Sequence, residues 1–280
     1  MYTTWSFNTC TSQFGGTSAA SPIAAGVAAL VLQANPLLSA RDVQHVLIRS
    51  ARRVNPTDPT WGFNGAGAGS MRAWSELFGF GAIDAGAAVA LAQTWTNRPP
   101  ESTIVAPVVT VNQTLPDNNA TGISSNVNVT GGLIVERAQL TLLAPHSRIG
   151  QLRVTLTSPT GSVATLAALR NDNTAGGYNN FTFSPVRFWD ERAAGTWTLR
   201  VSDETAAPLA TGSLMEWQLK LYGYTPACAC DWNLSGGAPT VQDLFDYLSS
   251  YFAGRGDLAG DGVSSLQDLF DFLACWFAGC

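Results

Sequence analysis

The sequence has few charged residues. Only 12% of its 280 residues are Asp, Glu, Lys or Arg, about half the usual share of roughly 25% in globular proteins. Lys220 is the single lysine, and 20 acidic against 15 basic residues give a formal net charge of −5. Because nucleic-acid-binding domains carry a basic surface, this balance excludes nucleic acid as an expected partner.

Long apolar runs are also missing. No run reaches the ~18 residues that a membrane-spanning helix needs, so we expect no membrane span. The N-terminus, MYTTWSFNTC, has neither a basic start nor an apolar core, and therefore shows no signal peptide. An apolar share of 46% is nevertheless enough for real cores. At roughly 100–150 residues per domain, the length allows two or three domains.

Cysteines are few and unevenly placed. Cys10 stands alone, whereas Cys228, Cys230, Cys275 and Cys280 lie at the two ends of the last segment. Cysteines grouped at both ends of one short segment predict disulfides that join those ends. Because disulfides persist in oxidising compartments, they also predict an extracellular or cell-surface location. A zinc site is the alternative, although Cys-Ala-Cys lacks the two-residue spacer of zinc knuckles and no histidine is near. The pairing among the four cysteines stays open.

Changes in pattern divide the chain into three segments. Residues 1–97 are alanine-rich and mainly helical: SPIAAGVAALVLQANP predicts a helix with proline in its first turn, and LLSARDVQHVLIRSA predicts another with a capping box. Residues 101–224 alternate apolar and polar residues between turn signals, which predicts an all-β antiparallel sandwich of the jelly-roll type. Residues 228–280 predict a small pair of helices.

The stretch FGGTSAASP places Ser18 between two glycines and the small residues that open a helix. A serine hydroxyl attacks a carbonyl only when a base takes its proton and donors stabilise the oxyanion. The N-terminus of a helix favours developing negative charge, so Ser18 is a candidate nucleophile. The alternative is that Ser18 is the N-cap of an ordinary helix.

The longer context resembles a known family. GTSAASPIAAGVAAL resembles the nucleophile motif of subtilisin-like serine proteases, and FGFGAIDAGAAVALA resembles the last helix of that catalytic domain. The Arg-Asp-Val-Gln-His run and Cys10, eight residues before Ser18, resemble the kexin/furin branch. The resemblance implies an α/β subtilisin-like fragment with Ser18 as the nucleophile, acting on peptide or protein substrates.

The family triad needs an aspartate and a histidine before the serine. The 17 residues that precede Ser18 contain neither, and the two histidines of the chain, His45 and His146, lack the context of the catalytic base. The oxyanion asparagine is missing as well. We therefore expect the isolated chain to be inactive, and interpret it as the C-terminal portion of a secreted serine endopeptidase whose Met1 results from truncation or from gene calling.

The sandwich segment resembles the P domain of kexin/furin-type proteases through LPDNNATGISSNVNV, FWDERAAGTWTLRVSD and GSLMEWQLKLYGY. That resemblance implies support of the catalytic domain rather than chemistry, whereas a carbohydrate-binding module is the alternative. The predicted strand-end carboxylates, which we interpret as solvated, are Asp190, Glu191, Asp203 and Glu204. The residues expected on core faces are Trp197, Leu199, Val201, Trp217, Leu219 and Leu221.

The last segment contains a repeat, because QDLFDYLSSYFAG and QDLFDFLACWFAG agree at nine of thirteen positions. Each copy follows an Asp- and Gly-containing stretch, an arrangement typical of EF-hand-like calcium loops. The predicted Ca²⁺ ligands of the second copy are Asp257, Asp261 and Asp268, with Ala259 where a ligand is usual. Those of the first copy, which is one residue longer, are Asp231, Asn233, Ser235 and Asp243.

These copies resemble a degenerate dockerin-type tail, as found in secreted bacterial proteins. The resemblance implies calcium and a docking or cell-surface partner. The alternative is that the aspartates cap helices without a metal. The residues expected between the two helices are Phe245, Leu248, Phe252, Phe270, Leu273 and Phe277. A non-enzymatic reading of the whole chain also stays open, in which an extracellular calcium-binding or assembly module carries a remnant protease segment.

Overall fold

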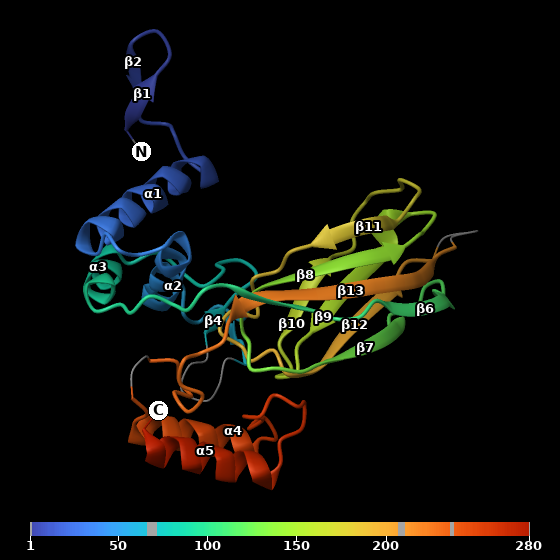
Figure 1. Ribbon diagram of the computed structural model, residues 1–280. Helices are drawn as coiled ribbons and strands as arrows, with labels where there is room; N and C mark the ends of the chain where they lie inside the picture. The colour runs from blue at the N-terminus through green and yellow to red at the C-terminus, as the bar shows by residue number, and fades with distance from the viewer. Residues whose placement is uncertain (1, 66–71, 207–210, 236–237, 280) are drawn as a thin grey trace. The chain divides into compact units, whose positions relative to one another are not determined.

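The computed structural model describes residues 2–279 except 66–71, 207–210 and 236–237. The chain forms two compact units. The first comprises Met1–Gly62 and Ala73–Arg98, and the second comprises Phe63–Arg72 and Pro99–Cys280. Figure 1 shows helices in the first unit, and a β-rich body followed by two helices in the second.

The first unit is built on three helices: α1 (Thr17–Ala34), α2 (Ala40–Ser50) and α3 (Ala85–Gln93). Its short strands are β1 (Thr3–Trp5), β2 (Thr9–Thr11), β3 (Gly62–Phe63) and β4 (Ala73–Trp74), of which β3 and β4 pair with each other. Its small core consists of Val27, Val31, Leu38, Val43, Val46, Ala88 and Ala92. The alanines of α3 let the helices approach closely.

Asp42 connects the start of α2 to the segment that follows α3. It completes the predicted capping box with Ser39, and its Oδ1 atom also accepts hydrogen bonds from Trp95 Nε1 at 3.0 Å and from the Arg98 backbone N–H at 2.8 Å. Burial acts to raise the pKa of Asp42, but the hydrogen bonds from Ser39, Arg98 and Trp95 together lower it below its usual value. Asp42 is therefore an ionised, buried anchor for the segment after α3.

The β-rich body is a sandwich of two antiparallel sheets. One has the strand order β10-β9-β12-β7, and the other the order β11-β8-β13-β5 with β6 added on β13. The bounds are β5 (Ser102–Val105), β6 (Val109–Thr114), β7 (Ile123–Val129), β8 (Ile134–Ala144), η1 (Ile149–Gln151), β9 (Leu152–Thr157), β10 (Val163–Ala167), β11 (Tyr178–Phe183), β12 (Gly195–Asp203) and β13 (Ser213–Tyr224).

Alternation along β12 and β13 sends every second side chain between the sheets. The six residues predicted for core faces there are each at most 1% exposed, which confirms that prediction. Trp197 contacts Phe188 edge-on at 4.9 Å between ring centroids, and its Nε1 donates to the Ala193 carbonyl. Trp217 Nε1 donates to Ser125 Oγ, so both buried indoles have acceptors.

The C-terminal segment contains α4 (Val241–Phe252) and α5 (Leu266–Ala278). The prediction of which residues lie between them was wrong for four of its six residues. Phe245, Phe252, Phe270 and Phe277 are exposed by 56% to 81%, whereas the two leucines, Leu248 and Leu273, are half-buried. The neighbouring helical face is buried instead, with Tyr247 stacked on Phe272 at 3.9 Å and Trp232 against both rings. The Cys230–Cys275 disulfide fixes this face inward, since it joins the stretch before α4 to α5.

Candidate functional site

Ser18 lies in the first turn of α1, which begins at Thr17. The N-cap is Gly16, with φ of 73° and ψ of −165°, a backbone conformation that glycine adopts far more easily than other residues. Ser18 is therefore not the N-cap, which removes that alternative. Its side chain is exposed, and among the described residues nothing hydrogen-bonds to it.

The start of α1 differs from the prediction in one respect. The helix begins four residues earlier than expected from SPIAAG, so Pro22 lies inside the helix rather than in its first turn. A proline has no N–H for the carbonyl four residues before it, and that carbonyl belongs to Ser18. The Ser18 carbonyl consequently lacks the usual helical hydrogen bond from the residue four positions later.

The two histidines have other contacts. His45 in α2 is completely buried, and its ring centroid is 5.8 Å from that of Trp95. His146 is buried in the sandwich, where Nε2 is 3.1 Å from Asp203 Oδ2 and Nδ1 contacts the Arg148 backbone. A Cβ atom on Gly212 would lie 2.0 Å from the His146 ring, so glycine is required there. Neither histidine hydrogen-bonds to Ser18 in the described part of the chain.

The apolar face of α1 has few contacts. Three of its 18 residues are buried, whereas Ile23, Leu30 and Leu32 are 55%, 47% and 41% exposed. By length and composition, with a mean hydropathy of 1.4, α1 also meets the criterion for a membrane span, which we did not expect from the sequence. The apolar core helix of a larger fold meets the same criterion.

The strand-end carboxylates of the sandwich are mostly buried, so the prediction that they are solvated was wrong. Asp190 is 1% exposed and accepts from Arg72 Nη2 at 2.9 Å and Nε at 3.0 Å. Glu191 is completely buried and accepts from Thr160 Oγ1 at 2.7 Å. The backbone N–H of Gly65 also donates to Glu191. Gly65 and Arg72 therefore supply partners for both carboxylates.

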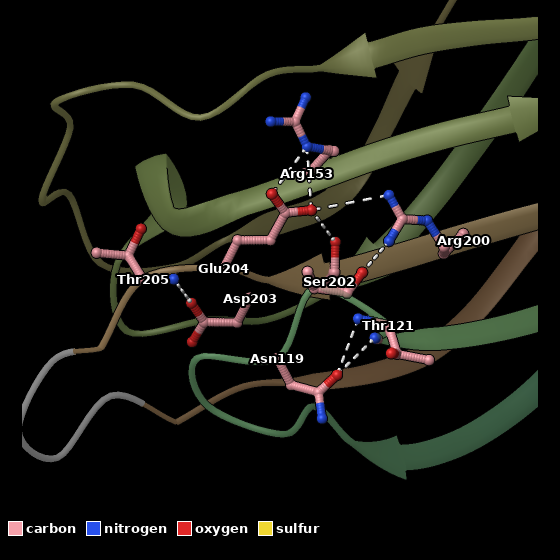
Figure 2. A network of polar contacts seen from close by, with 10 residues as sticks. Asn119, Thr121, Arg153, Arg200, Ser202, Asp203, Glu204 and Thr205 are labelled. Atoms are coloured by element: carbon pink, nitrogen blue, oxygen red, sulfur yellow. Dashed lines mark hydrogen bonds and ion pairs between the residues drawn. The ribbon is translucent and has the colours of Figure 1, made fainter.

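Figure 2 shows the second pair of carboxylates at the end of β12. Glu204 forms ion pairs with Arg153, at 3.0 Å, and with Arg200, while Ser202 Oγ donates to it at 2.8 Å. Burial acts to raise the pKa of Glu204, but Arg153, Ser202 and Arg200 lower it overall. This network of ion pairs and hydrogen bonds stabilises the end of β12.

The predicted calcium ligands of the second copy bind their own loop. Asp257 accepts from the backbone N–H groups of Gly260, Asp261 and Gly262, at 2.7–3.2 Å. Asp261 is exposed and accepts from the Val263 N–H.

Asp268 accepts four hydrogen bonds, two on each oxygen. The donors are the N–H groups of Leu258 and Ala259, and the N–H and hydroxyl of Ser265. Burial acts to raise its pKa, and these bonds lower it overall. A carboxylate offers about four lone pairs, so Asp268 has none left for an ion in this arrangement.

The first copy repeats this pattern. Asp243 accepts from the Asn233 N–H at 3.0 Å and forms a capping box with Thr240 at the start of α4. Asp231 accepts from the N–H and the hydroxyl of Ser235, at 2.9 and 3.3 Å. As they stand, the donor sets do not fit a calcium ion, because the closing aspartates cap helices. Calcium ligation therefore stays a prediction from the sequence.

The cysteines give a clearer outcome. Among the described residues, one group of three potential metal-binding side chains has its ligand atoms within 4.8 Å of one another, and it consists of Cys228, Cys230 and Cys275. Cys230 and Cys275 form a disulfide, as predicted for this cluster, so their sulfurs are not thiolates available to zinc. Cys280 lies outside the described residues, and Cys10 is a free, exposed cysteine.

Comparison with known proteins places these features in a family. Residues 1–81 match the subtilase family and residues 135–221 match the proprotein convertase P-domain. The chain is 38% identical over 220 residues to human proprotein convertase subtilisin/kexin type 4, covering 76% of this chain and 28% of that protein. It is 35% identical over 225 residues to human furin, covering 78% of this chain and 27% of furin.

A solved structure has a similar fold. The crystal structure of a serine protease of Aeromonas sobria aligns with a TM-score of 0.67 at 24% identity, over 78% of this chain and 46% of that one. The chain spans about a quarter of the length of the curated relatives named above. The chain thus carries a segment of the subtilase family followed by a P domain, and it is homologous to the kexin/furin-type proprotein convertases.

Proposed function

We propose that this chain is the C-terminal portion of a secreted serine endopeptidase in which Ser18 is the nucleophile. The observation that carries the proposal is the position of Ser18. It is exposed and lies in the first turn of an apolar helix, two residues after the glycine pair of a segment that matches the subtilase family. A Cβ atom on Gly16 would meet no other atom within 4 Å, so the chain before Ser18 is uncrowded, which supports the approach of a peptide in this proposal.

In this proposal the chain supplies one part of the reaction. Ser18 Oγ attacks the scissile carbonyl, its proton passes to a histidine, and that proton then goes to the leaving amine. The N-terminal N–H groups of α1 help to stabilise the oxyanion. The histidine and aspartate come from polypeptide outside these 280 residues, because both histidines of the chain are held in packing roles.

The substrates and the location follow from the relatives and from the disulfide. Two relatives are named as proprotein convertases or furin, so we propose peptide bonds of protein substrates as the target. The Cys230–Cys275 disulfide supports an oxidising, extracellular or secretory compartment. The P domain then serves folding, since Arg72 and Gly65 of the subtilase segment satisfy two of its buried carboxylates.

The test uses the complete gene product and its Ser18→Ala variant. We expect the wild type to hydrolyse peptides and to react covalently with a fluorophosphonate probe, and Ser18→Ala to lose about a millionfold in rate, as triad knockouts of subtilisin do. The 280-residue chain alone should not react with the probe. A complete product that neither cleaves peptides nor labels would refute the proposal and leave the non-enzymatic extracellular module as the function.

A further inference from the structure

Arg192 lies where the P domain meets the C-terminal segment 228–280. Its backbone belongs to the P domain, because it pairs with Ile134 in an isolated antiparallel bridge between the hydrogen bonds of Glu191 and Ala193. Its side chain extends to the C-terminal segment, where the guanidinium carbon lies 3.7 Å from the ring centroid of Trp232. This is a short, well-shielded cation–π contact.

Arg192 and Asp257, the first aspartate of the second predicted calcium loop, line the same cavity of about 230 Å³. Burial lowers the pKa of Arg192 to about 10, while Tyr224, Asp231 and Asp257 favour its charged form. Arg192 is therefore a cation at neutral pH, and the charge of the first aspartate of each predicted calcium loop favours that charged form. Among the described residues no acceptor meets its buried Nη2 atom, so the ring and the surrounding charges hold it.

Other contacts fix both loops on the same edge of the P domain. The backbone N–H of Gly131 donates to the Gly260 carbonyl at 2.7 Å, and a Cβ atom on Gly260 would lie 2.8 Å from Gly131. Gly262 lies against Asn128 in the same way, since a Cβ atom on Gly262 would lie 2.9 Å from Asn128 Oδ1. The first loop packs there through Leu234, which forms a buried cluster with Ile134 and Tyr224. Gly260 and Gly262 both have a positive φ and no space for a side chain, so these close approaches need glycine.

We propose that the C-terminal segment is a cap on its own P domain, and that Arg192 supplies the positive charge that the two aspartate loops would otherwise take from a metal ion. The docking partner of this segment is then the chain itself, and its docking does not depend on calcium. This inference is independent of catalysis by Ser18, so its test does not require an active enzyme.

The test compares variants of the full 280-residue chain. Arg192→Met keeps the length of the side chain and removes the charge, whereas Arg192→Lys keeps the charge without the planar stacking group. Arg255→Met is the matched control. Arg255 lines the same cavity of about 230 Å³ as Arg192, but its side chain is exposed, so removing its charge should not release the segment. Limited proteolysis in residues 225–227, between β13 and Cys228, reports release of the cap, and thermal unfolding in calcium or EDTA reports metal dependence.

We expect Arg192→Met to be cut about tenfold faster than the wild type, since proteolysis follows the population of the open form. Arg192→Lys should be intermediate, and Arg255→Met should behave as the wild type. The wild-type midpoint should not change between EDTA and about 10 mM calcium, which exceeds the range of extracellular calcium modules. A rise of several degrees in calcium, or equal cleavage of Arg192→Met and wild type, would overturn the proposal.

Discussion

Helix α1 and strand β13 are both strongly apolar, yet they differ in how much of their apolar surface is covered. Strand β13 has 12 residues and buries Leu214, Trp217, Leu219, Leu221 and Tyr224 to 1% exposure or less. Helix α1 has 18 residues and buries Ala19, Val27 and Val31. The P domain thus buries the apolar side chains of β13 against its own residues. The described residues that pack on α1 cover only part of the apolar surface of that helix.

This difference shows where stability resides. Two sheets whose inner faces interdigitate form a hydrophobic core from their own side chains. A long apolar helix gains stability only from the surfaces that pack against it, because isolated helices are marginal in water. Substitutions of similar size should therefore have large effects in the P domain and small effects in α1.

The largest effect should come from Trp217→Ala. The side chain is 1% exposed and its removal leaves a cavity between the sheets, so we expect a loss of about 3–5 kcal/mol in the free energy of unfolding. Urea unfolding followed by circular dichroism measures it. A loss below about 1 kcal/mol would mean that the sandwich core is not the main source of stability.

Arg72→Met should cause the second-largest loss in the free energy of unfolding. It leaves Asp190 buried without its guanidinium partner, and breaking such a pair costs about 3 kcal/mol or more. Because residues 63–72 fold with the P domain, the loss should appear in the same unfolding transition as Trp217→Ala. Arg72→Lys is the matched control and should recover part of the loss. A separate, earlier transition would show that this segment does not belong to the P-domain unit.

Asp42→Asn should have an intermediate effect within the first unit. The carboxylate caps α2 and also binds Trp95 and Arg98, so we expect a loss of about 1–2 kcal/mol. The pKa of Asp42 is lowered in the folded state, so its contribution is complete above the ordinary carboxyl value of about 3.9 and is lost as the pH falls through the lower folded value.

Hydrogen exchange of the α2 amides measures this prediction at neutral and acidic pH. The difference between Asp42→Asn and the wild type should shrink as the pH falls below about 4. A difference that stays constant down to the lowest pH would show that the ionised carboxylate is not what caps α2.

The smallest effect should come from Ile23→Ala in α1. The side chain is 55% exposed and alanine is a good helix former, so the change should stay within about 0.5 kcal/mol. Calorimetry of the 280-residue chain measures it. A loss in the free energy of unfolding similar to that of Trp217→Ala would show that this face of α1 is covered in solution. The two regions would then not differ in how far their apolar surface is buried.

Sequence periodicity predicted much of the fold. Alternation along β12 and β13 identified six core residues, because a strand has only two faces. The capping box at Ser39 and Asp42 was also predictable from local spacing. The face of α4 was not, since Phe245 and Tyr247 lie on different sides of the helix and both are large and apolar. The disulfide and Trp232, which come from outside the helix, decide between them.

The candidate site was predictable only in part. The FGGTSAASP stretch identified Ser18, because a short motif contains both the nucleophile and its glycine turn. Spacing could not show that Asp243 and Asp268 cap helices, since capping and calcium ligation use the same residue type near a helix start. Arg192 carried no sequence signal at all, because its partner Trp232 is 40 residues away along the chain.

The Cys230–Cys275 bond has a further consequence for how cleavage of the C-terminal segment is detected. It joins positions 45 residues apart, and Cys230 is completely buried. A single nick anywhere between these sulfurs therefore leaves both pieces tethered, and only a reductant that reaches the interior separates them. Damage of this kind would be invisible on a non-reducing gel and would appear as a shorter chain once the thiols are freed.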